Sequence, residues 1–243
     1  MVQDFVTALQ FLTRLQLVKE SEWSPEKFAS SVPYFPLVGA VIGVILAGVY
    51  YLLVPFLPPA VLAAFLIAIE IALTGGLHGD GLMDTADGMF SGRSRERILD
   101  IMKDSRVGAN GVMAFCLFVL LKWSLLIEIK APVLTAALVL MPIISRFAMV
   151  AGITLFPYAR MEGMGKAFSQ CPPAKTLAVA GLFTVMTVAP FGLTGWVSLG
   201  LTGLFVILFG RYVTSILGGL TGDVYGAMTE ISSVIVLAAY LVW

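Results

Sequence analysis

Charged residues are scarce in this chain of 243 residues. Asp, Glu, Lys and Arg make up 12% of it, about half the share expected of an ordinary soluble domain. Hydrophobic residues make up 59%, and the mean hydropathy is +0.96. A water-soluble protein of this size could not cover its surface with so few charges. The composition therefore predicts a protein embedded in a lipid bilayer.

Other scarcities exclude further classes of protein. The two cysteines, Cys116 and Cys171, show no spacing typical of a zinc site or a disulfide framework. The net charge is zero, which gives no support to binding of nucleic acid. The first residues lack the basic segment of a secretory signal, and Asp4 interrupts them, so we expect no cleaved signal peptide.

Long apolar runs predict an all-α polytopic membrane helix bundle that forms a single domain, 1–243. Residues 2–18 are too polar to span, but their apolar side chains recur at helical spacing, which predicts an amphipathic helix. Together with a link in which Pro25 starts a short helix, it makes up an interfacial segment, 1–28. The last run is short, so we expect six to seven transmembrane helices. The predicted spans are 34–56, 60–78, 109–129, 132–156, 175–191, 196–217 and 229–243.

Basic residues indicate how the bundle is oriented. With the N-terminus inside, twelve of them fall on one side, and only Lys122 and Lys130 fall on the other. The positive-inside rule then predicts a cytoplasmic N-terminus and cytoplasmic polar loops. Arg146 falls within the fourth predicted span, where it could pair with Glu70 of the second.

The segment 79–107 is predicted to be a cytoplasmic, aspartate-rich loop that carries the chemistry. Asp80, Asp84 and Asp87 are spaced so that, on a helix, they would share one face. Like charges at that spacing repel one another unless a cation lies between them. Because Mg²⁺ binds carboxylate, water and phosphate oxygens, we expect a divalent metal held by these three residues, with Asp104 as a further ligand.

Several other side chains are predicted to belong to the same site. Asp84, Asp87, Asp104 and His78 are the candidate catalytic groups; His78, the only histidine, is equally compatible with a structural role. Residues 94–100 are interpreted as a solvated connector. The residues expected to bind substrate or its phosphates are Arg93, Lys103, Arg106, Arg160, Lys166 and Asp223.

Six segments spread over nearly the whole chain form a family-like pattern. They are FLTRLQ at 11–16, PYFPLVGAVIG at 33–43, LTGGLHGDGLMDTADGMFSG at 73–92, IMKDSRVGANGV at 101–112, YARMEGMG at 158–165 and GGLTGDVYGA at 218–227. In these segments the chain resembles the cobalamin synthases, the adenosylcobinamide-GDP ribazoletransferase family. Gly79 departs from the family pattern, in which a bulkier residue often follows the histidine.

The resemblance implies a transferase of the late joining step in coenzyme B12 biosynthesis. Adenosylcobinamide-GDP would react with α-ribazole, or its 5′-phosphate, to give GMP and adenosylcobalamin, or its phosphate. The resemblance also implies Mg²⁺ dependence and a multi-pass location in the bacterial inner membrane. Metal at Asp80, Asp84 and Asp87 would bridge the pyrophosphate, while a carboxylate or His78 takes the hydroxyl proton.

Two other functions are compatible with parts of the sequence. A membrane transporter would use intramembrane charges such as Glu70 and Arg146. A prenyltransferase-like enzyme would bind an isoprenoid diphosphate through two aspartate-rich motifs on different helices, and TGDVYGAMTE at 221–230 would have to supply the second. The clustering of carboxylates in one segment favours the transferase over the transporter.

Overall fold

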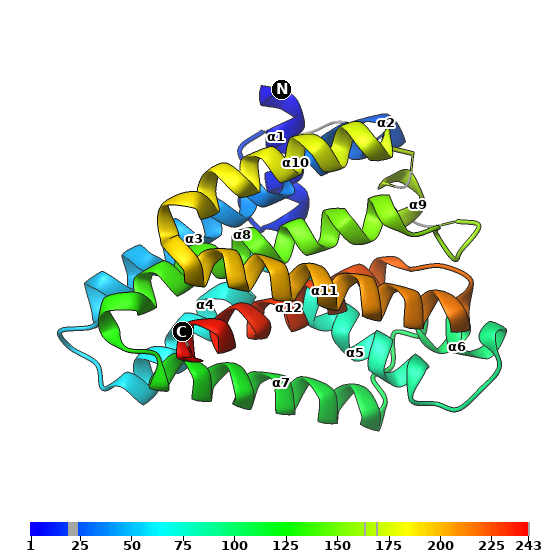
Figure 1. The fold of residues 1–243 in the computed structure, drawn as a ribbon. Coiled ribbons are helices and arrows are strands. Elements are labelled where there is room, and N and C mark those ends of the chain that lie inside the picture. Colours follow the sequence, from blue (N-terminus) through cyan, green and yellow to red (C-terminus); the bar gives the residue numbers. More distant parts are fainter. Residues whose placement is uncertain (19–23, 163, 169, 243) are drawn as a thin grey trace.

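The computed structural model describes residues 1–18, 24–162, 164–168 and 170–242 (Figure 1). This part of the chain contains no β-strand, so the predicted all-α fold is confirmed; the β-type pairing it contains is an isolated bridge between Tyr158 and Leu220. Lys19 and the rest of 19–23 in the predicted link lie outside the described residues, as does Trp243 at the end of the last predicted span.

Helices of very different lengths make up the bundle. In chain order they are α1 (Val2–Leu12), α2 (Pro25–Ser31), a 3-10 turn (Val32–Tyr34), α3 (Phe35–Leu53), α4 (Pro59–Thr74), α5 (Leu77–Met89), α6 (Arg95–Ile101), α7 (Ala109–Glu128), α8 (Ala131–Leu155), α9 (Met164–Phe168), α10 (Pro173–Val188), a second 3-10 turn (Ala189–Phe191), α11 (Gly192–Leu217) and α12 (Gly222–Val242). The amphipathic helix predicted near the N-terminus is confirmed as α1, which ends at Leu12 rather than at residue 18 and buries Leu9 and Leu12 against the bundle.

Among the described residues, five helical segments are long and apolar enough to cross a membrane, or six if α4 and α5 count as one broken span. One of the five, Pro173–Leu217, contains both α10 and α11. Figure 1 shows these two helices running back past each other, as the separate predicted spans 175–191 and 196–217 require. The chain is therefore a multi-pass membrane protein.

Helix α8 runs through the middle of the bundle (Figure 1) and is largely buried. Helix α3 packs against it at very short range, because a Cβ atom at Gly39 or Gly43 would overlap the α8 backbone at Pro142 and Val139. Small residues let two membrane helices bring their backbones together. The van der Waals contacts that result stabilise the helix pair in lipid, where the hydrophobic effect does not drive helices together.

The second predicted span, 60–78, is wrong as a single straight helix. Helix α4 ends at Thr74, and α5 leaves it at an angle of 91°. The bend occurs at Gly75 and Gly76, whose φ angles of 65° and 72° lie in the left-handed region that glycine adopts without strain. Two consecutive glycines in an apolar run thus mark a change of direction.

The predicted loop, 79–107, is mostly helical. Its first half lies in α5, and residues 95–101 form α6, so the acidic segment is a helix rather than a flexible connection. The last span also begins earlier than predicted, since α12 starts at Gly222 and not at residue 229. Asp223 consequently stands in the first turn of a long helix.

Candidate functional site

The three aspartates of α5 share one face, as their spacing predicts. Helix α5 is pressed against the start of α12, because a Cβ atom at Gly81 would meet the backbone of Asp223 and of Gly226. The glycines therefore let two helices that are distant in sequence approach each other closely. Their contact brings Asp223 to the acidic face of α5.

Four carboxylates and one guanidinium are electrostatically linked at this contact. The charges that act most strongly on Asp84 are the negative charges of Asp80, Asp223 and Asp87 and the positive charge of Arg160. Arg160 Nη2 lies 2.8 Å from Asp223 Oδ2, and both side chains are mostly buried. We call Asp80, Asp84 and Asp223 the acid cluster; it unites two predicted metal ligands with a residue predicted to bind substrate.

Asp87 has a different environment from the other two aspartates of α5. Its carboxylate accepts hydrogen bonds from the backbone N–H groups of Gly108, at 2.7 Å, and of Gly111, at 2.8 Å. A Cβ atom at either glycine would overlap the carboxylate. An anion at a helix N-terminus binds otherwise unpaired N–H groups, so Asp87 ties α5 to the start of α7. Its predicted roles as metal ligand and base stay predictions.

Asp104 forms its contacts away from the acid cluster. Arg106 Nη2 lies 2.7 Å from Asp104 Oδ2, and this charged hydrogen bond lowers the pKa of Asp104 to about 2. Its predicted role as a fourth ligand or a base therefore also stays a prediction. Of the other predicted phosphate-binding residues, Arg93 and Lys103 are exposed, and Lys166 donates to the carbonyl oxygen of Met161.

The connector 94–100 is not simply solvated. Arg95 Nε donates to the carbonyl oxygen of Leu217 at 2.7 Å, and Arg95 Nη2 donates to that of Ala159 at 3.2 Å. The side chain thus caps the C-terminal end of α11, where carbonyl groups lack partners within the helix. This contact fixes α6 against the loop that carries Arg160.

His78 lies fully buried on α5. Its two ring nitrogens have no hydrogen-bond partner within the described residues. It lines a small cavity of about 110 Å³ together with Asp80, Asp223 and Tyr225. Its predicted role as a base stays a prediction, but it lies beside the acid cluster and faces the same cavity.

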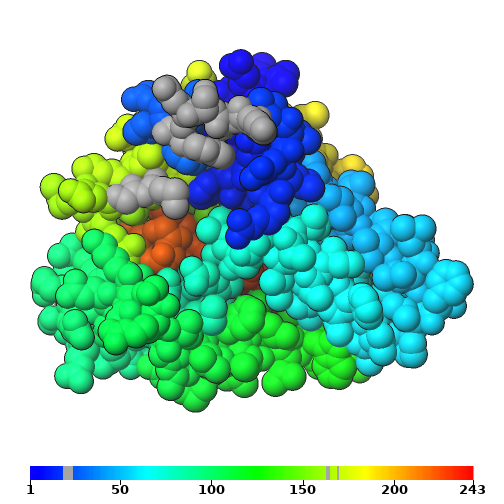
Figure 2. Space-filling view, turned by 180° about the vertical axis from the view of Figure 1, so that it is seen from behind, coloured from blue at the N-terminus to red at the C-terminus, as the bar shows by residue number. Residues whose placement is uncertain are grey.

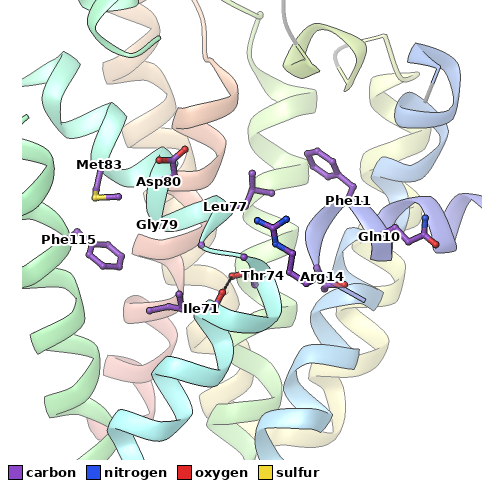
Figure 3. Close-up of a pocket in the computed structure, with 13 residues that line it drawn as sticks. Gln10, Phe11, Arg14, Ile71, Thr74, Leu77, Gly79, Asp80, Met83 and Phe115 are labelled. Carbon is purple, nitrogen blue, oxygen red and sulfur yellow. Dashed lines mark hydrogen bonds between the residues drawn. The ribbon is translucent and has the colours of Figure 1, made fainter. Parts of the chain in front are cut away.

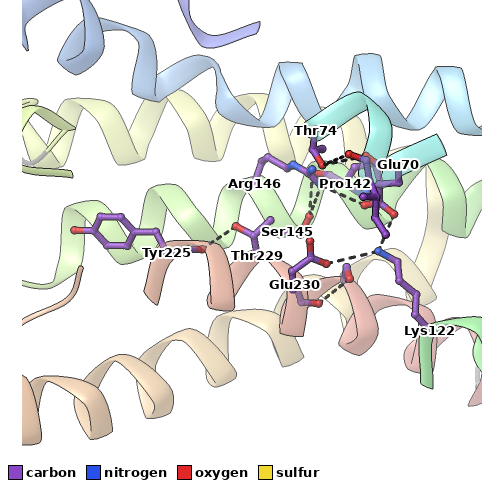
Figure 4. Close-up of polar contacts among 11 residues, drawn as sticks. Glu70, Thr74, Lys122, Pro142, Ser145, Arg146, Tyr225, Thr229 and Glu230 are labelled. Atoms are coloured by element: carbon purple, nitrogen blue, oxygen red, sulfur yellow. Dashed lines mark hydrogen bonds and ion pairs between the residues drawn. The ribbon is translucent and has the colours of Figure 1, made fainter. Parts of the chain in front are cut away.

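A buried network of charges lies deeper in the bundle (Figure 4). Glu70 Oε2 lies 2.7 Å from Lys122 Nζ, Glu70 Oε1 lies 3.8 Å from Arg146 Nη1, and Glu230 Oε2 lies 3.8 Å from Lys122 Nζ. The expected pairing of Glu70 with Arg146 is confirmed. Lys122, counted above among the basic residues of the outer side, is buried within α7 and therefore does not lie in a loop; its position inside an apolar run was the signal.

A larger cavity, of about 570 Å³, is also lined by Asp80 and lies between α1 and the α4–α5 turn (Figure 3). Arg14 and Gln10 of the N-terminal segment line it. In the sequence, Arg14 belongs to the family-like segment FLTRLQ, but neither residue was predicted to bind substrate. Figure 2 shows a hollow on this side of the molecule in which the orange start of α12 is visible between the blue N-terminal segment and the aqua α5.

The comparison with protein families matches almost the entire chain. Residues 4–241 fit the family model described as cobalamin-5-phosphate synthase. The chain belongs to this family. It is therefore a transferase enzyme of cobalamin synthesis. No solved structure matches it significantly.

Curated members of the family are similar to it from end to end. A protein of Desulfitobacterium hafniense named adenosylcobinamide-GDP ribazoletransferase is 41% identical over 95% of this chain and 93% of its own length. A protein of Desulforamulus reducens with the same name is 44% identical over 92% of this chain and 90% of its own length. A third protein with this name, from Roseiflexus, is 41% identical over 95% of this chain and 86% of its own length. Because the similarity extends over nearly the full length of these proteins, the whole bundle, and not one segment, is shared with the family.

Proposed function

We propose that this protein joins adenosylcobinamide-GDP to α-ribazole, or its 5′-phosphate, and releases GMP. The observation that carries the proposal is the acid cluster, which α5 and α12 assemble and whose Asp80 lines both cavities. The full-length relatives of the chain bear the name of this transferase. The product is adenosylcobalamin, or its 5′-phosphate.

We propose Mg²⁺ as the cofactor, and the donor set fits that ion. The cluster offers oxygen ligands, and its mutually repelling carboxylates have Arg160 as a compensating charge. Within the described residues, no three His, Cys, Asp or Glu side chains already form a group able to hold a metal. Mg²⁺ usually takes one or two carboxylates and completes its shell with water and substrate phosphate, so two carboxylates of the cluster would be enough. When bound, it would stabilise negative charge on the phosphates.

The chain's own residues have separate tasks in this reaction. A hydroxyl oxygen of the ribazole forms a bond to the phosphorus attached to cobinamide, the bond from that phosphorus to the GMP oxygen breaks, and GMP leaves. A carboxylate of the cluster accepts the hydroxyl proton. Asp84 is our candidate for this base, because it lies among the acidic neighbours Asp80, Asp87 and Asp223. Arg160, held by Asp223, stands at the edge of the cluster where phosphate oxygens would lie.

We also propose that the acid cluster faces the cytoplasm from a bacterial inner membrane. The support is the distribution of basic residues. With Lys122 buried inside α7, the short connections at the opposite end of the bundle retain Lys130 as their basic side chain. The asymmetry that the positive-inside rule uses is therefore larger than the sequence count indicated.

The two alternative functions gain no support from the comparisons. The intramembrane charges that a transporter would use compensate one another within the network around Glu70. The proteins similar to this chain are named as ribazoletransferases and not as enzymes of isoprenoid diphosphates.

The direct test uses purified protein in liposomes, supplied with Mg²⁺, α-ribazole and adenosylcobinamide-GDP. The expected result is stoichiometric formation of GMP and adenosylcobalamin. If no GMP forms and one substrate accumulates inside the vesicles instead, the protein is a transporter and the proposal is wrong. Because this assay contains no isoprenoid diphosphate, GMP formation in it also excludes the prenyltransferase alternative.

A further inference from the structure

The cavity of about 570 Å³ is built like a pocket for a molecule of nucleoside size. Pockets for small ligands have volumes of roughly 300–1,000 Å³, and this one lies in that range. It is too small to enclose a corrinoid that carries a nucleotide. Its wall combines the charged side chains Arg14 and Asp80 with apolar ones that include Met83 and Phe115 (Figure 3). Such a wall suits a ligand with an apolar ring and an ionic group.

Arg14 is held in place, but its guanidinium is uncommitted. The backbone N–H of Arg14 donates to the carbonyl oxygen of Leu73 at 2.7 Å, which fixes the residue against the end of α4. The guanidinium lies over Gly75, where a Cβ atom would overlap it. It forms no hydrogen bond or ion pair with any side chain in the part of the chain that the structure describes.

The uncharged polar groups in the same wall already have partners. Gln10 accepts hydrogen bonds from the backbone N–H groups of residues 17 and 18. The hydroxyls of Thr13 and Thr74 donate to carbonyl oxygens one helical turn earlier. Arg14 and Asp80 are therefore the wall groups with charge available for a ligand, one positive and one negative.

We propose that Arg14 binds the phosphate of a phosphorylated nucleoside. This proposal rests on the function proposed above, under which the nucleoside is α-ribazole 5′-phosphate. A guanidinium binds phosphate oxygens in a two-pronged manner. The apolar base lies along Met83 and Phe115, and the reacting ribose hydroxyl points toward Asp80. Since Asp80 also lines the small cavity that contains Asp223, the hydroxyl reaches the acid cluster.

The test compares two nucleoside substrates in the Arg14→Gln variant. With adenosylcobinamide-GDP in excess, kcat/KM for α-ribazole 5′-phosphate falls about tenfold to a hundredfold, the loss expected when a hydrogen-bonded charge is removed. The value for unphosphorylated α-ribazole stays unchanged, which also shows that the variant is folded. Arg14→Lys keeps a charge and recovers part of the loss. Arg97→Gln, at an exposed arginine of α6, leaves both values unchanged.

The same guanidinium chemistry would bind a lipid phosphate, so the assay is run in neutral phosphatidylcholine vesicles with and without phosphatidylglycerol. The Arg14 effect persists without the anionic lipid; an effect that requires it overturns the proposal. An equal loss for both nucleosides, or no loss, overturns it as well. Equilibrium dialysis of the two nucleosides against wild type and Arg14→Gln measures binding without turnover. The dialysis therefore decides the role of Arg14 even if no GMP is formed. The absence of GMP would contradict only the proposed function.

Discussion

Lys122 Nζ lies 2.7 Å from Glu70 Oε2 in the interior of the bundle, and both side chains are less than one tenth exposed. The pair joins α7 to α4, the helix whose end turns into the acidic α5. Arg146 and Glu230 extend it to α8 and α12 (Figure 4). Ionic groups at such depth are costly unless they are paired. The pairing therefore fixes α4, α7, α8 and α12, the last of which carries Asp223 of the acid cluster, relative to one another.

Removing the lysine should destabilise the protein strongly. Lys122→Met leaves the carboxylates of Glu70 and Glu230 without their shared partner, and breaking a buried pair in this way costs about 3–5 kcal/mol. Thermal unfolding in detergent should show a lowered Tm. Lys130→Met, at an exposed lysine between α7 and α8, is the matched control and should leave the Tm unchanged. Equal Tm values for the two variants would contradict the structural importance of the network.

Gly111 should not tolerate a side chain. In Gly111→Ala, the new Cβ atom overlaps the Asp87 carboxylate and approaches the backbone oxygen of Met83, so the hydrogen bonds that tie α5 to α7 are disrupted. Leaving such buried groups unpaired costs about 1–3 kcal/mol. Chemical unfolding monitored by tryptophan fluorescence measures this loss. The neighbouring Asn110→Ala adds no such overlap, and an equal effect of both substitutions would refute the explanation.

Gly75 should be required for the shape of the proposed nucleoside pocket. Gly75→Ala puts a Cβ atom at a left-handed φ of 65° and into the Arg14 guanidinium. The strain amounts to about 1 kcal/mol or more, and Arg14 must move. We expect an increased KM for α-ribazole 5′-phosphate. Gly48→Ala on α3, where a Cβ atom would meet nothing within 4 Å, should behave like wild type. A normal KM in Gly75→Ala would show that the pocket does not depend on this turn.

Removing divalent metal should abolish the reaction without unfolding the protein. Without the ion, nothing in the acid cluster would stabilise negative charge on the phosphates, so the metal-free protein should form no product, and added Mg²⁺ should restore the rate. GMP release measured before and after EDTA treatment, with circular dichroism as the folding control, gives the answer. Full activity of protein that contains no detectable metal would rule out the metal proposal.

The sequence was sufficient for the overall class of the fold and for the common face of the three aspartates, but not for the helical state of the predicted loop 79–107. Apolar runs are a strong signal in a membrane, because every span must be both long and apolar. The spacing of Asp80, Asp84 and Asp87 gave their common face. The bend at Gly75 and Gly76 was hidden within a continuous apolar run, since hydropathy carries no information on the direction of the backbone.

The remaining parts of the site depend on tertiary contacts. Asp87 and Asp84 look alike in the sequence, and only the approach of Gly108 and Gly111 distinguishes a capping carboxylate from one in the cluster. Arg14 reaches the site because its backbone N–H donates to the carbonyl oxygen of Leu73 at the end of α4, a contact between segments far apart in the sequence. No local pattern encodes it. The pairing of Lys122 with Glu70 was likewise not predicted, because the two residues lie on different helices.

The most direct test of the central claim is the rate of GMP release by Asp84→Asn compared with Asp100→Asn. Asp84 lies at the centre of the acid cluster, whereas Asp100 is an exposed carboxylate of α6 whose ion pair with Arg97 spans 4.0 Å. With adenosylcobinamide-GDP, α-ribazole and Mg²⁺ in liposomes, Asp84→Asn should release essentially no GMP while retaining the wild-type circular dichroism spectrum. Asp100→Asn should match wild type. Wild-type GMP release by Asp84→Asn would contradict the assignment of the acid cluster as the reaction centre.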